Sequence, residues 1–393
     1  MISSDGVPDA GHGETGSESS ENRLPSWFTE PGPDNDVVVS SRVRLARNLA
    51  GFSFPGFMTP QEESEVASGV VQLFQDRFST REYLVVDPSR LARHSLQLLV
   101  ERNLVSDDFP TAARTVLILR SDERFAASVN LVDHLRLSVL RGGRRVAEAF
   151  EEADRIDRIV EADLPYAVSL EWGYLNSEIT NIGTGMRASV LLHLPALIET
   201  DQAPEVFETV TRSGFMVKGF WVSDGEESPR RSLGQMYQLA NLITIGVRET
   251  DIVEKLDKAA SQLVNYERKA RRGLMRGRKH AIIEKRVADA KAKLLTGKSL
   301  SYREAVELLS EIRLGVALGL FPDAQLESVT ALFFVSQRSH VLHALRADGN
   351  NDEVRPQGGT TELSEAEEVT EIEPETIDER RAALIRGYLY PHV

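Results

Sequence analysis

The chain has 393 residues, no cysteine and a formal net charge of −14 at pH 7. Its length allows two or three domains, and the absence of cysteine excludes disulfides, thiolate zinc sites and cysteine nucleophiles. The acidic charge argues against direct nucleic-acid binding, because a phosphate backbone repels an acidic protein. No apolar run reaches the roughly 18 residues of a membrane span and the amino terminus has no signal pattern, so we predict a cytoplasmic protein without membrane contact.

The amino-terminal region contains a polar tail followed by an arginine-rich strand. Residues 1–25 are rich in Ser, Gly and acids, which predicts a disordered tail. Residues 36–48, DVVVSSRVRLARN, begin as a β-branched run and place Arg42, Arg44 and Arg47 close together. In an extended strand Arg42 and Arg44 project from the same face, where two guanidinium groups repel each other unless an anion lies between them. A solvated surface strand is the alternative.

Helices and then a strand meander follow. Apolar residues at three- and four-residue spacing predict packing helices over residues 59–104. Residues 115–119, 125–130 and 134–140 predict three consecutive antiparallel strands, with turns at residues 121–123 and 131–133. This meander places Asp133, His134 and Arg136 together at the start of a strand. A structural histidine is the alternative to a base for His134.

A Gly-rich turn lies within YLNSEITNIGTGMRASVLLHLPAL, residues 174–197. A helix at 146–160 precedes it, and strands at 166–174 and 188–194 flank it. Gly183 and Gly185 can adopt positive φ, and Arg187 at the exit of the turn supplies a planar fork of donors. The stretch therefore predicts an anion site, with an ordinary hairpin as the alternative.

The second half of the chain is mostly helical in pattern. Residues 215–221 predict a strand, and VSDGEESPRR, residues 222–231, has the composition of a mobile flap. We expect helices over residues 232–321, and basic residues outnumber acids over 254–293. This basic stretch is either a solvated face or a docking surface for an acidic partner. An acidic linker at about residues 347–376 precedes a final amphipathic helix at 377–389.

Together these stretches resemble the phosphagen kinase family, and specifically the bacterial protein-arginine kinases, over residues 36–390. The matching pieces are SSRVRLARN (40–48), VNLVDHLR (129–136), WGYLNSEITNIGTGMRASV (172–190), and KGFW followed by DGEES (218–221 and 224–228). The resemblance implies an α+β fold, in which an antiparallel β-sheet is ringed by α-helices. This is the glutamine-synthetase-like catalytic fold of the phosphagen kinases. The resemblance also implies a catalytic domain at 26–260, a helical phosphoarginine-binding-like domain at 261–393, ATP and Mg²⁺ as cofactors, and arginine residues of proteins as acceptors.

The resemblance assigns nucleotide contacts to the arginines and to their neighbours on the same strands. These positions are Ser40, Ser41, Arg42, Val43, Arg44, Arg136, Arg187, Ala188, Ser189, Val190, Leu191 and Lys218. Lys218 replaces a family arginine, and Asn103 stands where the family has a nucleotide-contacting histidine. Phosphoryl transfer depends mainly on positioning and charge stabilisation, so arginines that converge on a triphosphate suit it.

The acceptor side departs from the family pattern. A guanidinium has a pKa above about 12, so a carboxylate must orient it and take its proton. The family's adjacent glutamates align here with Leu131 and Val132. We expect Glu226 in the flap, with Glu178 or Asp133, to act instead; Glu178 stands where the family has a cysteine. The alternative is a catalytically impaired pseudokinase that binds ATP or phosphoarginine and regulates a partner.

The carboxy-terminal IDERRAALIR resembles the family's phosphoarginine-binding motif. It matches at Asp378, Arg381 and Ala382, but Ile377 replaces the first arginine. We therefore expect weak phosphoarginine binding, with a simple docking helix as the alternative. The resemblance further implies a role in protein quality control, protein substrates, an activator or protease adaptor, and a possible homodimer.

Overall fold

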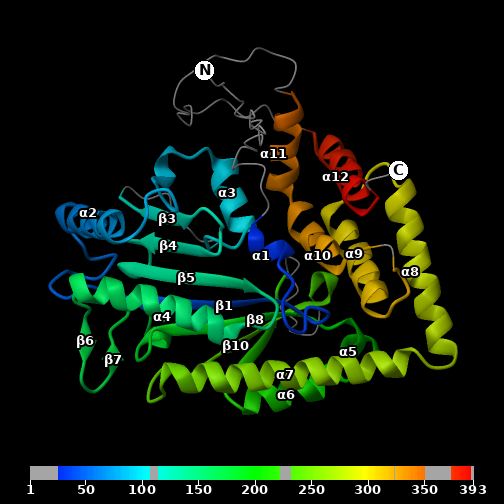
Figure 1. Cartoon of the computed structure of the whole chain (residues 1–393), viewed down its shortest axis with the longest axis horizontal. Coiled ribbons are helices and arrows are strands. Elements are labelled where there is room, and N and C mark those ends of the chain that lie inside the picture. Colours follow the sequence, from blue (N-terminus) through cyan, green and yellow to red (C-terminus); the bar gives the residue numbers. More distant parts are fainter. Residues whose placement is uncertain (1–24, 107–113, 222–231, 323, 350–372, 391–393) are drawn as a thin grey trace, which may run out of the picture.

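The fold is organised around one eight-stranded antiparallel sheet, in the order β2-β3-β4-β5-β1-β8-β10-β9 (Figure 1). The computed structural model describes residues 25–106, 114–221, 232–322, 324–349 and 373–390. The strands of the sheet are β1 (Val38–Arg47), β2 (Tyr83–Val86), β3 (Val116–Arg120), β4 (Phe125–Val129), β5 (Leu135–Gly142), β8 (Met186–His193), β9 (Phe215–Gly219) and β10 (Met236–Asn241).

Helices cover both faces and one end of this sheet (Figure 1). They are α1 (Ser26–Thr29), α2 (Pro60–Arg77), α3 (Arg93–Glu101), α4 (Val146–Asp163), α5 (Pro195–Glu199), α6 (Ala203–Arg212), α7 (Glu249–Leu274), α8 (Arg278–Thr296), α9 (Tyr302–Ala317), α10 (Leu326–Val335), α11 (Arg338–Gly349) and α12 (Pro374–Leu389). The expected α+β fold, an antiparallel sheet ringed by helices, is confirmed. In the described ranges no helix combines the length and apolar character that crossing a bilayer requires.

The two faces of the sheet differ because side chains alternate along each strand. Val43 and Leu45 of β1 are fully buried, in one core with Val139 of β5 and Val190 of β8. Helices α4 and α7 pack against this face. The alternate residues of the same strands point to the opposite face, where the candidate site lies.

A second hydrophobic core is formed between the carboxy-terminal helices and helix α1, which begins the described part of the chain. Trp27 and Phe28 of α1 are buried against Phe334 of α10, with ring centroids 5.1 Å and 4.6 Å apart. Trp221, which follows β9, stacks on Phe333 at 6.0 Å. Helix α10 is therefore held beside the polar face of the sheet by contacts between residues far apart in the sequence.

Three sequence-based expectations differ from the structure. β2 lies in the region expected to be helical. It is a four-residue edge strand whose Leu84 and Val85 are exposed. Because it is so short, it did not disturb the helical spacing of apolar residues in the sequence around it. β10 also lies in an expected helical region and is nearly all buried between β8 and β9, so it lacks the alternation that marks a half-exposed strand. The strand expected at 166–174 is the small hairpin of β6 (Val168–Ser169) and β7 (Gly173–Tyr174).

Other expectations fall partly outside the described residues. The expected tail, residues 1–25, lies outside them except for Pro25, and so does the whole expected flap, residues 222–231. The linker expected at 347–376 overlaps the end of α11 and the start of α12, and its remainder is not described.

Candidate active site

Five cations share the polar face of the sheet because of strand register. Arg44 of β1 lies opposite Arg187 of β8, two residues along the strand from Arg42. Arg136 of β5 lies opposite Ala46 of β1, which places it on the same face. Lys218 of β9 lies opposite Gln238, which in turn lies opposite Leu191 of β8. The arginines predicted to grip an anion are thus brought together from three strands, and Lys218 joins them from a fourth.

Two cations of this face have lowered pKa values. Burial, together with Arg44 and Arg136, lowers the pKa of Arg42 well below its usual value. Burial, together with Arg44 and Arg187, also lowers the pKa of Lys218. Arg42 Nε donates to the Ser138 hydroxyl at 2.9 Å, a neutral partner that leaves the charge in place. A face that disfavours its own positive charges is suited to an anionic ligand.

A cavity of about 190 Å³ opens on this face. Its lining consists of Arg44, Ala46, Ser106, Val132, Arg136, Glu178, Asn181, Gly185 and Arg187. Glu178 is the carboxylate among these residues; it is exposed and accepts a hydrogen bond from Asn181 Nδ2 at 2.9 Å. The described lining of the cavity therefore presents three guanidinium groups and one carboxylate to a ligand.

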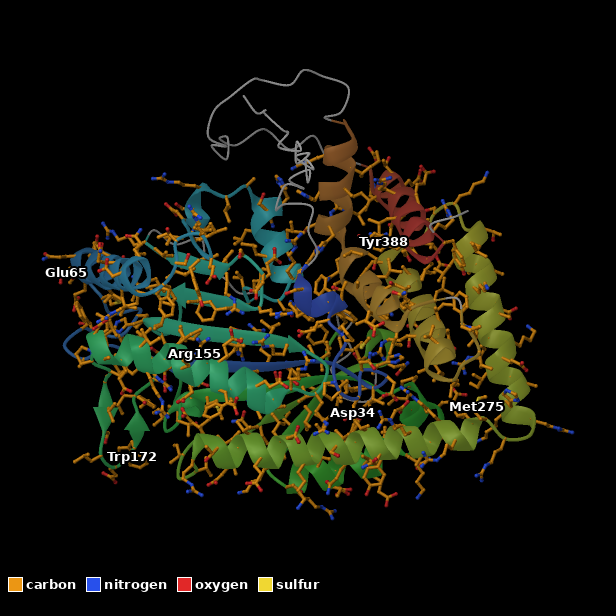
Figure 2. All side chains as sticks on the ribbon, viewed as in Figure 1. Asp34, Glu65, Arg155, Trp172, Met275 and Tyr388 are labelled. Carbon is orange, nitrogen blue, oxygen red and sulfur yellow. The ribbon has the colours of Figure 1, made fainter. Side chains whose placement is uncertain are left out.

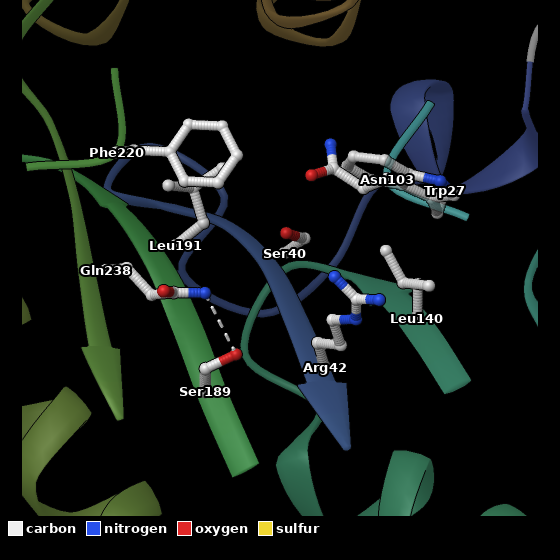
Figure 3. A pocket seen from close by; sticks show the side chains of 9 residues that line it. All are labelled: Trp27, Ser40, Arg42, Asn103, Leu140, Ser189, Leu191, Phe220 and Gln238. Carbon is white, nitrogen blue, oxygen red and sulfur yellow. Dashed lines mark hydrogen bonds between the residues drawn. The ribbon is translucent and has the colours of Figure 1, made fainter. Parts of the chain in front are cut away.

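A second hollow adjoins the first along β1. Arg42 lines it together with Trp27, Ser40, Asn103, Leu140, Ser189, Leu191, Phe220 and Gln238. Figure 3 shows Phe220 and Leu191 on one side and Trp27 and Asn103 on the other, with Arg42 and Ser40 between them. Gln238 donates to the Ser189 hydroxyl at 3.3 Å. The hollow combines aromatic walls with polar groups at its base, next to the arginines.

The Gly-rich turn positions Arg187 by close backbone packing. Gly183 has φ 108°, and a Cβ there would lie 2.3 Å from the carbonyl oxygen of Thr244. Gly185 has φ 61°, and a Cβ there would lie 2.5 Å from the carbonyl oxygen of Ala46. The expected positive φ angles are confirmed, and substitution of either glycine would separate the turn from the strands it contacts.

Arg47 lies apart from the other arginines of its strand. Its guanidinium is buried between Asp157, at 2.7 Å, and Glu249, at 3.1 Å, and lies 3.7 Å from the ring centroid of Tyr174. These partners neutralise Arg47, and they belong to the core beneath the sheet. Of the three closely spaced arginines, Arg42 lines the aromatic hollow and Arg44 lines the cavity, whereas Arg47 is structural.

Asp133 and His134 lie beneath the cavity wall. Asp133 is fully buried and accepts hydrogen bonds from Asn48 Nδ2 at 3.0 Å and from the backbone N–H of Ser177 at 2.9 Å. Its other oxygen lies 3.8 Å from Arg136. His134 Nδ1 accepts from a backbone N–H, so its Nε2 donates to the carbonyl of Ser53 at 2.8 Å. This neutral tautomer makes His134 a structural residue, the alternative given above.

The other residues expected to contact the nucleotide lie on two different faces of the sheet. Ser40, Ser189 and Leu191 line the aromatic hollow. Four others point toward the core or a backbone group instead: Ser41, Val43, Ala188 and Val190. Glu226 lies outside the described residues. Leu131 and Val132 have different surroundings. Leu131 packs against a small apolar cluster, whereas Val132 lines the cavity.

Arg381 and Ala382 of the carboxy-terminal motif are buried, and Asp378 is half-buried. Arg381 Nε and Nη1 donate to the carbonyls of Ser336 and Leu300, each at 2.7 Å, and Nη1 also pairs with Asp378. Ala382 is fully buried in the second core. In this arrangement Arg381 ties α12 to the ends of neighbouring helices.

Sequence reasoning missed Asn241, which is buried at the end of β10. Its Oδ1 accepts from the backbone N–H of Ala188 at 2.8 Å, its Nδ2 donates to the carbonyl of Met186 at 3.1 Å, and its own carbonyl accepts from Arg187 Nη1 at 3.1 Å. Asn241 therefore holds both the backbone and the guanidinium of Arg187. Because β10 was expected to be helical, no sequence signal placed Asn241 at the site. Trp27 and Phe220 were missed as wall residues.

Within the described ranges, no group of three or more His, Asp or Glu side chains is arranged to hold a metal ion. Glu178 is a single carboxylate, which is insufficient for a dedicated cation cage.

Comparison with known proteins agrees with this geometry. The ATP:guanido phosphotransferase C-terminal catalytic domain matches residues 64–270, and the protein-arginine kinase McsB C-terminal domain matches residues 280–391. The protein-arginine kinase of Moorella thermoacetica is 36% identical over 371 residues, 93% of this chain and 98% of the relative. That of Bacillus subtilis (strain 168) is 32% identical over 376 residues, 94% of each chain. The crystal structure of lombricine kinase shares the fold, with a TM-score of 0.53 at 19% identity over 65% of this chain and 71% of that one. The chain belongs to the protein-arginine kinase family of ATP:guanido phosphotransferases.

Proposed function

We propose that this protein transfers the γ-phosphoryl group of ATP to the guanidinium of arginine residues in proteins. The supporting observation is the cationic face of the sheet, where Arg44, Arg136 and Arg187 line a cavity that also contains Glu178. Arg42, on the same face, lines the adjoining aromatic hollow. A triphosphate would be held by several charge-assisted hydrogen bonds, and the same groups would stabilise the charge that develops during transfer.

The two adjoining hollows suggest how ATP lies. The base and ribose would occupy the aromatic hollow between Phe220 and Trp27, and the phosphates would extend along β1 past Arg42 to Arg44. Mg²⁺ would be carried by the phosphate oxygens and water, because it retains waters and needs few protein carboxylates. When bound it would supply charge neutralisation at the phosphates.

Glu178 would orient the acceptor. The guanidinium of a substrate arginine is repelled by Arg44, Arg136 and Arg187, so its binding requires a nearby carboxylate. Glu178 lines the same cavity, and a carboxylate there can accept the proton released when the guanidinium nitrogen bonds to phosphorus and the ADP oxygen leaves. We propose that Glu226 contributes from residues 222–231, and that buried Asp133 positions Arg136.

The alternative is a pseudokinase that binds ATP without transferring phosphate. It is favoured by the two aliphatic residues, Leu131 and Val132, at the position of the family's glutamates. Loss of one proton-accepting carboxylate costs roughly a hundredfold to ten-thousandfold in rate. Both functions require the nucleotide, so ATP binding alone does not separate them.

One experiment distinguishes the two functions. The purified protein is incubated with γ-labelled ATP, magnesium and an arginine-rich protein, and acid-labile label on the acceptor is measured. Arg187→Ala is the control, expected to weaken ATP binding by about 1.5 kcal/mol or more through loss of a charge-assisted contact. ATP binding without labelled acceptor would support the pseudokinase; unchanged affinity in Arg187→Ala would remove Arg187 from the site.

Partner binding is proposed for the corner between α7 and α8, marked by Met275 in Figure 2. Five cations there are exposed: Lys269, Arg272, Arg276, Arg278 and Lys279. An acidic surface of an activator or protease adaptor would be complementary to it, which fits a role in protein quality control. Homodimer formation stays a prediction. For α12 we favour a docking helix with weak phosphoarginine binding, since Arg381 Nε and Nη1 are already engaged.

A further inference from the structure

Four exposed aliphatic side chains lie in two loops beside the acceptor end of the cavity. The exposed fraction is 78% for Ile179, 43% for Leu242, 53% for Ile243 and 40% for Ile245. We name these four residues the apolar rim. Single exposed aliphatic residues are common on protein surfaces, but four in two adjoining loops next to a reactive cavity form a patch of the kind that binds partners.

The two loops of the apolar rim are bonded to each other. Thr244 Oγ1 donates to the carbonyl of Thr180 at 3.1 Å, and the backbone N–H of Thr184 donates to the carbonyl of Thr244 at 3.0 Å. Ile179 is adjacent in sequence to Thr180, and Ile243 and Ile245 flank Thr244. The rim is therefore held in place by the same contacts that hold the Gly-rich turn.

On each loop the rim directly follows a residue of the candidate site. Glu178, the carboxylate of the cavity, directly precedes Ile179. Asn241, whose carbonyl holds Arg187, directly precedes Leu242. An acceptor arginine oriented by Glu178 would thus enter the cavity next to the rim. In an extended peptide, residues two or three positions from the arginine lie about 7–10 Å away, a distance that reaches neighbouring loops.

The rim also borders a shallow hollow that has room for a side chain. Phe215, Ile243, Val247 and Ile252 line it, together with Ser213, Gly214, Asn241, Asp251 and Lys255. Gly214 contributes no side chain, and a Cβ there would lie 3.4 Å from Cδ1 of Ile243. Its lining offers apolar contact near Asn241, on the side of the site where no phosphate is expected.

We propose that the apolar rim and its hollow bind aliphatic side chains that flank the acceptor arginine, so that the protein selects arginines within apolar polypeptide segments. This inference rests on the proposed function, because it assigns the acceptor to the cavity lined by Glu178. Burial of one aliphatic side chain against the rim corresponds to roughly a tenfold gain in affinity. Charged or glycine-rich flanks gain nothing from these contacts.

The test compares two fluorescently labelled peptides of equal length and net charge. Each carries one central arginine, flanked on both sides either by leucine and valine or by serine and glycine. Affinity is measured by anisotropy in the presence of Mg-ADP, and phosphoryl transfer is measured with Mg-ATP. The full chain is expected to bind the aliphatic peptide at least about tenfold more tightly.

Two variants locate the preference. The double variant Ile179→Ser, Ile243→Ser is expected to reduce the ratio of the two affinities at least fivefold, while ADP affinity is unchanged. Ile282→Ser is the matched control: Ile282 is 55% exposed on α8, outside the site, and its replacement should leave the ratio intact. Equal affinities for the two peptides, or an unchanged ratio in the double variant, would overturn the proposal.

The two proposals fail separately in this design. Aliphatic preference in binding without transfer to either peptide would support the rim and reject the proposed catalysis. Transfer to both peptides with equal kcat/KM and equal affinity would reject the rim and support the proposed catalysis.

Discussion

Arg42 and Arg47 lie five residues apart on β1, and we expect opposite effects when each is replaced by methionine. Arg42 is on the polar face beside Arg44, with Arg136 nearby, and its hydrogen bond goes to a neutral hydroxyl. Arg47 is on the core face between two carboxylates. Methionine preserves much of the apolar volume in both cases, so the difference between the variants reports charge.

The magnitude for Arg42→Met follows from the strand geometry. Like charges about 7 Å apart, the spacing of alternate strand residues, repel by about 2 kcal/mol at an effective dielectric constant of about 20. Loss of the hydrogen bond to Ser138 costs about 1 kcal/mol. The ligand-free variant is therefore expected to gain about 1 kcal/mol in unfolding free energy, a rise of about 2 °C in Tm. Its affinity for Mg-ATP should fall at least about tenfold.

Arg47→Met is expected to destabilise the protein. Removing one partner of a buried ion pair costs about 3–5 kcal/mol, because buried Asp157 and half-buried Glu249 would be left as uncompensated carboxylates. Thermal unfolding of both variants with and without Mg-ATP provides the assay, with calorimetry for nucleotide affinity. A lower Tm for ligand-free Arg42→Met than for the parent would refute the inference that repulsion between the arginines of the polar face destabilises the ligand-free protein.

The remaining predictions concern the acceptor, the carboxy terminus and pH. Glu178→Gln should abolish arginine phosphorylation while leaving ATP affinity nearly unchanged, and adding Val132→Glu should restore part of the transfer. Full activity of Glu178→Gln in a labelled-acceptor assay would exclude the idea that Glu178 has taken over the acceptor-orienting role of the family's glutamates. Free phosphoarginine titrated into the full chain should bind weakly, and submicromolar affinity in calorimetry would show that Arg381 is not committed to its carbonyls. Burial, with Arg313 and Arg271, lowers the pKa of His193 well below its usual value, so the imidazole is neutral in the folded state. In the unfolded chain a histidine titrates near pH 6.5, so the contribution of neutral His193 to the free energy of unfolding is complete above about pH 6.5. This contribution declines as the pH falls, by up to about 1.4 kcal/mol per pH unit. The denaturant midpoint of His193→Gln should therefore decline less between pH 7 and pH 5 than that of the parent.

Local patterns in the sequence predicted part of the site. The run before Arg42 is β-branched, and two residues two apart on a strand must share a face, so the pairing of Arg42 with Arg44 followed directly. The same parity places Arg47, five residues from Arg42, on the other face, although only the structure identified its partners Asp157 and Glu249. Glycine at the turn before Arg187 also had a local physical reason, which the positive φ angles confirm.

Non-local packing explains what the sequence could not predict. Trp27 forms a wall of the aromatic hollow because Phe334, some 300 positions later, supports its ring; no local periodicity contains that relation. Asn241 lies at the end of a strand that is buried between β8 and β9, and its residues show neither alternation nor a β-branched run. Strands of this kind are hard to distinguish from buried helices.

The charge of the cavity links nucleotide binding to acceptor binding. Among the described residues that line the cavity, the guanidinium groups of Arg44, Arg136 and Arg187 accompany the carboxylate of Glu178, so the proposed function brings an acceptor guanidinium close to like charges. A bound triphosphate would reverse the sign of that field and leave Glu178 free to pair with the acceptor. Under the proposed function, the residues that would hold the phosphates would also control the entry of an arginine. The coupling would be reciprocal, because a bound acceptor cation would raise the affinity for the nucleotide by the same factor.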